Sequence, residues 1–108
     1  MALMTQKLID GLPALYSNET NPDPLVYCKF FNPGGAGTWY VTEGEVQPDG
    51  DILFFGLIDL QEQELGYFML SELEAIRVSP IPGLEPMLPL ERDLYLGKCH
   101  LNDIRGAL

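Results

Sequence analysis

Residues 38–60 read TWYVTEGEVQPDGDILFFGLIDL. Thr38–Glu43 alternates between two faces, which is the period of a half-buried β-strand. Ile52–Leu60 is apolar on both faces, which is typical of a strand at the centre of a sheet. Between them, Gln47–Asp51 contains the turn sequence Pro-Asp-Gly. The stretch therefore predicts an antiparallel hairpin in the middle of a β-sheet.

Further strands are predicted on both sides of this hairpin. Leu25–Phe31 is rich in aromatic and apolar residues and is followed by Asn-Pro-Gly-Gly, which ends a strand. Leu65–Leu70 supplies a fourth strand, and the alternation over Leu90–Leu96 supplies a fifth. Gly56 inside the central strand indicates a β-bulge or a close backbone approach. We expect an antiparallel sheet of four to five strands.

Two short helices are also predicted. Thr5 is a good N-cap for a helix over Gln6–Asp10. Ser71-Glu72-Leu73-Glu74 matches a capping box with Ser71 as the cap, which starts a helix that ends near Arg77. With 108 residues, 46% of them hydrophobic, the chain suits one domain with a single core. The predicted fold class is α+β, in a single domain over residues 1–108.

Charge is the strongest functional signal. Sixteen acidic residues against six basic ones give a formal charge of −10, which argues against binding nucleic acid or an anionic membrane directly. No lysine or arginine occurs between Phe30 and Arg77. An acidic face keeps a small protein soluble, and it also attracts basic protein surfaces. The predicted partner-binding residues are Glu43, Glu45, Asp49, Asp51, Asp59, Glu62, Glu64 and Glu72.

Motifs for cofactors and metals are weak. Asp49-Gly50-Asp51 lacks the further ligands of a calcium loop and is ordinary turn chemistry, so no metal is expected. The glycines of residues 34–37 are not followed by Gly-Lys-Ser/Thr, so a hairpin loop is favoured over a phosphate site and no cofactor is expected. Cys28 and Cys99 lack a C-x-x-C spacing, which favours reduced thiols, although a disulfide between them stays open. Without a secretory signal the chain is expected to be cytoplasmic.

Arg92 stands on the apolar side of the last predicted strand, between Glu91 and Asp93. A partly buried arginine needs a carboxylate or another acceptor. We therefore expect a structural ion pair that ties the last strand to the sheet, with ligand binding as the other role for these three residues.

Several blocks together resemble a small bacterial family of unknown function. They are Lys29-Phe30-Phe31-x-Pro33, Thr38-Trp39-Tyr40-Val41-x-Glu43, Phe54-Phe55-Gly56, Glu64-Leu65-Gly66-Tyr67-Phe68, Ser71-Glu72-Leu73-Glu74 and Glu91-Arg92-Asp93-Leu94-Tyr95. The resemblance implies a setting on plasmids, phages or integrative elements, often near or fused to ArdC-type antirestriction proteins. It carries no established activity or catalytic residues.

Three functions follow from these observations. The favoured one is an accessory interaction protein of a mobile element, and its sharper form is an anti-defence inhibitor whose acidic surface blocks a basic DNA-binding or nuclease partner. The alternative is a small enzyme or small-molecule binder with a pocket of Glu43, Glu64 and Arg92. A third is a subunit of an obligate complex whose exposed apolar residues, in the Pro80–Leu90 loop, meet a partner or a second copy of the chain.

Overall fold

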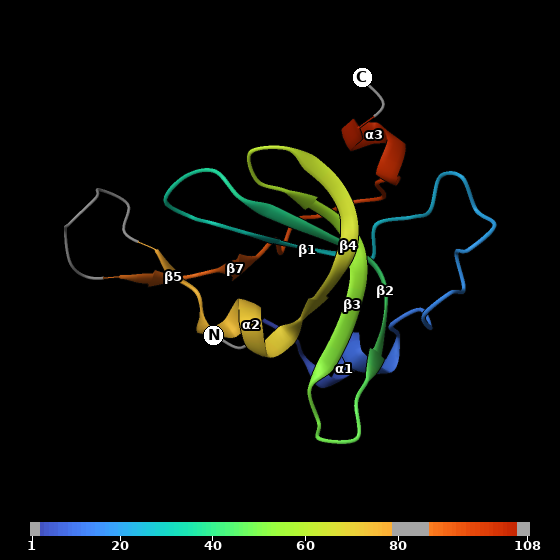
Figure 1. Cartoon of the computed structure of the whole chain (residues 1–108), viewed down its shortest axis with the longest axis horizontal. Helices are drawn as coiled ribbons and strands as arrows, with labels where there is room; N and C mark the ends of the chain where they lie inside the picture. The colour runs from blue at the N-terminus through green and yellow to red at the C-terminus, as the bar shows by residue number, and fades with distance from the viewer. Residues whose placement is uncertain (1–2, 79–86, 106–108) are drawn as a thin grey trace.

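The computed structural model describes residues 3–78 and 87–105. Its centre is a five-stranded antiparallel sheet in the order β4-β3-β2-β1-β7, beside a two-stranded sheet of β5 and β6 (Figure 1). The strands are β1 (Cys28–Phe31), β2 (Thr38–Val46), β3 (Ile52–Asp59), β4 (Gln63–Met69), β5 (Arg77–Val78), β6 (Leu88–Pro89) and β7 (Glu91–Arg92). The helices are α1 (Gln6–Asp10), α2 (Leu70–Ala75) and α3 (Leu101–Arg105). The predicted α+β class is confirmed.

The last strand is shorter than the sequence predicts. A continuous strand over Leu90–Leu96 was expected, whereas β7 contains only Glu91 and Arg92. The reason is a local turn, in which the Asp93 carboxylate accepts a 2.9 Å hydrogen bond from the backbone N–H of Tyr95. Aspartate commonly bends the chain in this way, because its side chain competes with the strand ladder for the backbone.

The helix caps agree with the prediction at one helix only. The Thr5 hydroxyl accepts from the backbone N–H of Leu8 at 3.2 Å, as expected for the cap of α1. The predicted box at Ser71 is wrong, because the N-cap of α2 is Met69, two residues earlier, and the Glu72 carboxylate accepts the N–H of Met69 at 3.0 Å. None of the helices in the described part of the chain is long and apolar enough to cross a membrane.

One face of the sheet, which we call the core face, carries the main hydrophobic core. Phe30, Phe54 and Phe68 are buried in neighbouring positions, with ring centroids 5.7 Å apart for the first pair and 5.6 Å for the second. Residues of α1 and α2 pack on this core. A smaller cluster lies around Val26, Leu57 and Leu101. Side chains alternate along β3, and Phe54 lies on the core face, so Leu57 belongs to the opposite face.

A β-bulge in β2 decides which face Glu43 takes. Val41 lies opposite Gly56, yet Glu43 lies opposite Phe55, so the register shifts by one residue at Thr42. In a regular strand Glu43 would share the core face with Val41, whereas the bulge turns it to the opposite face beside Phe55. The backbones are so close here that a Cβ on Gly56 would lie 1.7 Å from the carbonyl oxygen of Tyr40. The close approach predicted at Gly56 is confirmed.

Candidate functional site

Glu43 is buried, with 5% of its surface exposed. Its Oε1 accepts a 2.8 Å hydrogen bond from the backbone N–H of Tyr16, and its Oε2 accepts one of 3.1 Å from the N–H of Asn18. The Asn18 side chain in turn donates to the carbonyl of Thr42 at 3.3 Å. The expectation that Glu43 belongs to the exposed acidic surface is therefore wrong, because the bulge directs it beneath the segment that follows α1.

A groove of about 450 Å³ lies above Glu43, on the face of the sheet opposite the core face. One wall is the segment 16–24 and the other is the face formed by β2, β3 and β4. Among the described residues, no lysine or arginine lines it. The lining residues are Tyr16, Asn18, Glu19, Asn21, Pro22, Pro24, Thr42, Glu43, Phe55, Leu65 and Tyr67.

The groove is mainly aromatic at its rim. Phe55 and Tyr67 pack with ring centroids 4.9 Å apart, and the Tyr67 side chain is 51% exposed. A hydrogen bond with the Tyr16 side chain is the main cause that raises the pKa of Tyr67, and the charges of Glu43 and Glu19 raise it further. Tyr67 therefore keeps its proton at neutral pH, and both tyrosines offer hydroxyl groups to a ligand.

Sequence reasoning missed this pair of tyrosines. Tyr16 is 62% exposed and has a positive φ of 69°, and no motif singled it out. The alternation of β4 contained the signal for Tyr67, since Phe68 beside it is buried and neighbouring side chains point to opposite faces.

The remaining acidic residues differ in their exposure. Asp51 and Asp59 are half-buried, whereas the others predicted for the partner surface are exposed. Asp51 accepts hydrogen bonds from the hydroxyl of Ser71 at 2.5 Å and from the backbone N–H groups of Ser71 and Ile52 at 3.0 and 2.8 Å. These bonds, the one from the Ser71 hydroxyl above all, lower the pKa of Asp51. The exposed residues are Glu45, Asp49, Glu62, Glu64 and Glu72.

A family model described as "Protein of unknown function (DUF2958)" matches residues 3–101. The chain belongs to this family. The groove and all the acidic residues predicted for the partner surface lie within the matched residues of this DUF2958 domain. Neither the curated proteins nor the solved structures contain a significant match.

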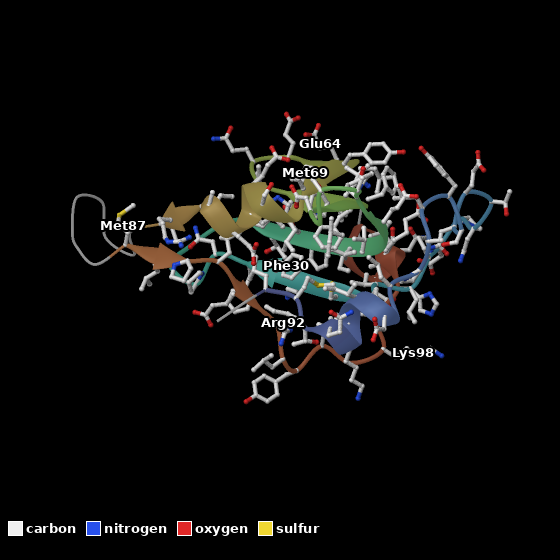
Figure 2. The ribbon with its side chains drawn as sticks, turned by 90° about the horizontal axis from the view of Figure 1, so that it is seen from below. Phe30, Glu64, Met69, Met87, Arg92 and Lys98 are labelled. Atoms are coloured by element: carbon white, nitrogen blue, oxygen red, sulfur yellow. The ribbon has the colours of Figure 1, made fainter. Side chains whose placement is uncertain are left out.

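The proposed pocket of Glu43, Glu64 and Arg92 does not form in the DUF2958 domain. Glu64, Ile58, Trp39, Phe30 and Arg92 occupy one row across all five strands, so Glu64 and Arg92 lie at opposite edges of the sheet. With strands spaced by about 4.8 Å, their backbones are roughly 19 Å apart. Figure 2 shows the two side chains on opposite sides of Phe30. Glu43 lies on the other face, so this prediction is wrong.

Arg92 has a structural contact at the edge of the sheet. Its Nη1 donates a 2.5 Å hydrogen bond to the carbonyl oxygen of Leu3, which joins β7 to the segment before α1. An ion pair between the last strand region and the sheet is formed by Asp93 and Lys29, at 3.7 Å. Glu91 is exposed opposite Phe31 of β1. The last strand region is thus tied to the sheet by the ion pair of Lys29 and Asp93, and the ion pair expected for Arg92 stays a prediction.

Metal and thiol chemistry finds little support in the described residues. Within 3–78 and 87–105, no group of three histidine, cysteine, aspartate or glutamate side chains is placed to hold a metal. Cys28 and Cys99 are both free thiols, the first buried and the second half-buried. Burial raises the pKa of the Cys28 thiol to about 12, so it is protonated and unreactive at neutral pH. The Pro80–Pro86 part of the expected apolar contact loop lies outside the described residues.

Proposed function

We propose that this DUF2958 domain is a protein-interaction module of a mobile element, and that its acidic surface blocks a basic DNA-binding or nuclease partner. The single observation that carries the proposal is the separation of charge in the molecule. From β2 to α2 the chain contains no lysine or arginine, whereas Glu45, Asp49, Glu62, Glu64 and Glu72 are exposed there.

The basic side chains are found elsewhere. Lys29 pairs with Asp93, and Arg92 binds the Leu3 carbonyl, both at the β1–β7 edge. Figure 2 shows Glu64 on one side of the molecule, and Arg92 and Lys98 on the other. This arrangement leaves the β3–β4 side with one sign of charge. Such a surface suits a partner that is basic over a wide area.

A DNA-binding groove is such a partner, because it must neutralise many phosphates with lysine and arginine. An acidic protein that covers the groove competes directly with DNA for these cations. The interaction should therefore weaken steeply as the salt concentration rises. If the acidic surface serves solubility alone, no particular basic partner is selected.

The test is affinity capture with the tagged domain from a bacterial lysate, repeated with excess duplex DNA and at higher salt. The Glu62→Gln/Glu64→Gln variant carries the test, and Asp10→Asn/Glu91→Gln is the matched control, because both pairs remove the same charge from exposed positions and neither control residue lines the groove. We expect the domain to capture a DNA-binding protein, and we expect both excess DNA and higher salt to release it. The Glu62→Gln/Glu64→Gln variant should fail to capture this protein, whereas the control variant should still capture it. Capture that ignores DNA and salt overturns the proposal.

A further inference from the structure

We propose that β4 is the docking strand for an extended, basic segment of the partner, which adds to the sheet as a sixth strand beside it. This inference rests on the proposed function, since it names the part of the acidic side that makes the contact and the conformation of the bound segment. The observations that carry it are the open edge of β4, the hollows on both of its faces and the local charge.

β4 is a long and exposed edge of the sheet. It pairs with β3 through seven positions, from Leu53↔Met69 to Asp59↔Gln63. In the described residues, no strand pairs with its outer side. Gln63, Glu64, Leu65 and Tyr67 are all exposed. The opposite edge, β7, has only two residues. β4 therefore offers the longer row of backbone groups to an incoming strand.

Devices that usually protect an edge strand are missing from β4. Natural edges are commonly blunted by proline, by lysine or by a bulge. β4 has the sequence QELGYFM, without proline or lysine, and its register with β3 is continuous. The bulge of this sheet lies in β2 instead. Only the charge of Glu64 opposes random pairing, and that charge favours a basic strand.

Side chains of an added strand would enter hollows on both faces of β4. Leu65 and Tyr67 line the groove of about 450 Å³. Glu64 lines an open hollow of about 610 Å³ on the other face, with Glu62, Ile58 and Leu60. Since the side chains of a strand alternate between faces, a segment that alternates basic and apolar residues fits both sides. Its basic residues would meet Glu62 and Glu64, and its apolar residues would meet Leu65 and Tyr67.

A second copy of the chain is a poorer occupant than a basic segment. Each copy carries a formal charge of −10. Pairing of two β4 strands would place two copies of the exposed carboxylates of Glu62 and Glu64 along one shared edge, and like charges repel each other. The charge pattern thus selects a basic partner and opposes self-association through the same edge.

The probe for the test is a short synthetic peptide that alternates lysine and valine. Two further versions of the peptide are methylated on backbone nitrogens. One carries the methyl groups on the backbone nitrogens of its lysines and the other on those of its valines, so that each version loses the N–H donors along one edge of the strand. We expect the unmodified peptide to bind and to slow hydrogen exchange at β4 amides. At least one methylated version should bind about tenfold or more weakly, because it loses the backbone hydrogen bonds along the edge that faces β4.

Charge reversal supplies the matched control. Glu64→Lys on β4 should weaken binding of the unmodified peptide, whereas Glu91→Lys on β7 should leave it within about twofold, because the two residues lie at opposite edges. Equal binding of all three peptides overturns the added strand but leaves the acidic-surface function standing if capture of the basic protein still depends on Glu62 and Glu64. Dimers that form through β4 without peptide would also overturn the basic occupant.

Discussion

The backbone N–H of Tyr16 donates a 2.8 Å hydrogen bond to the buried carboxylate of Glu43, which lies 27 residues further along the chain. Together with the 3.1 Å bond from the N–H of Asn18, this contact fixes the segment after α1 against β2. The groove beside β4 exists because this segment forms its second wall. Glu43 therefore supports the candidate site from within, without being exposed on it.

Glu43→Ala should release the segment 14–20. Two backbone N–H groups would lose their acceptor in a poorly hydrated place, and we expect the free energy of unfolding to fall by about 3 kcal/mol. Urea denaturation checks the stability, and hydrogen exchange at Tyr16 and Asn18 checks the location. Glu45→Ala, on the same strand but exposed, should change stability by less than about 0.5 kcal/mol. Unchanged exchange at both amides in the first variant would contradict the assignment.

Gly56→Ala should prevent folding or cause a severe loss of stability, more than about 3 kcal/mol. The added Cβ would meet the backbone oxygen of Tyr40 at 1.7 Å, and two strands would have to separate. Gly66→Ala is the control, because Gly66 pairs with Gly56 yet its Cβ would meet only Ile58 Cδ1 at 3.5 Å. Soluble yield and thermal melting of the two variants check the difference. Equal melting temperatures would be incompatible with the close approach.

Cys28 should make the protein less stable in alkaline solution. Burial raises its pKa from 9.0 to about 12 in the folded state, so the thiol ionises first in the unfolded chain. Stability is unaffected below about pH 9 and then falls by about 1.4 kcal/mol per pH unit until the folded pKa is reached. Cys28→Ala should make the decline between about pH 9 and pH 10 shallower in urea titrations. The same slope in both proteins would refute this.

The bond from Ser71 should hold the pKa of Asp51 below its ordinary value. A lowered carboxyl pKa stabilises the folded state above the unfolded pKa, and this contribution is lost as the pH falls through the folded value. Ser71→Ala should raise the pKa of Asp51, measured by the NMR titration of its carboxyl carbon. Ser17→Ala, in the segment after α1, is the control and should leave the pKa of Asp51 unchanged. A fixed Asp51 pKa in the first variant would remove Ser71 as the cause.

The sheet was predictable because its strands carry local signals. The largely apolar stretch Ile52–Leu60 indicated an interior strand, which is β3, and Pro-Asp-Gly indicated the hairpin turn. The ends of elements depended on single hydrogen bonds, which have no periodic signal. The strand β7 ends early because the Asp93 carboxylate accepts the N–H of Tyr95. At the start of α2, Glu72 rather than the expected Glu74 accepts a backbone N–H, that of Met69.

The candidate site was harder to predict, because it depends on the bulge at Thr42. A shift of one residue sends every following side chain to the other face, and this moved Glu43 from an expected surface patch to the floor of the groove. The acidic character of the β3–β4 side could be predicted from the distribution of charged residues in the sequence alone. Tyr16 entered the site through a non-local contact, which alternation within one segment cannot reveal.

The partners of β1 arrive late in the chain. Its outer neighbour is β7, whose Arg92 binds the carbonyl of Leu3, and Leu25 just before it pairs with His100. During synthesis on the ribosome, the antiparallel meander of β2, β3 and β4 can form from contiguous residues before the second neighbour of β1 has been synthesised. The five-stranded sheet can therefore be completed only after translation has passed Arg92, and the bridge of Leu25 only after translation has passed His100.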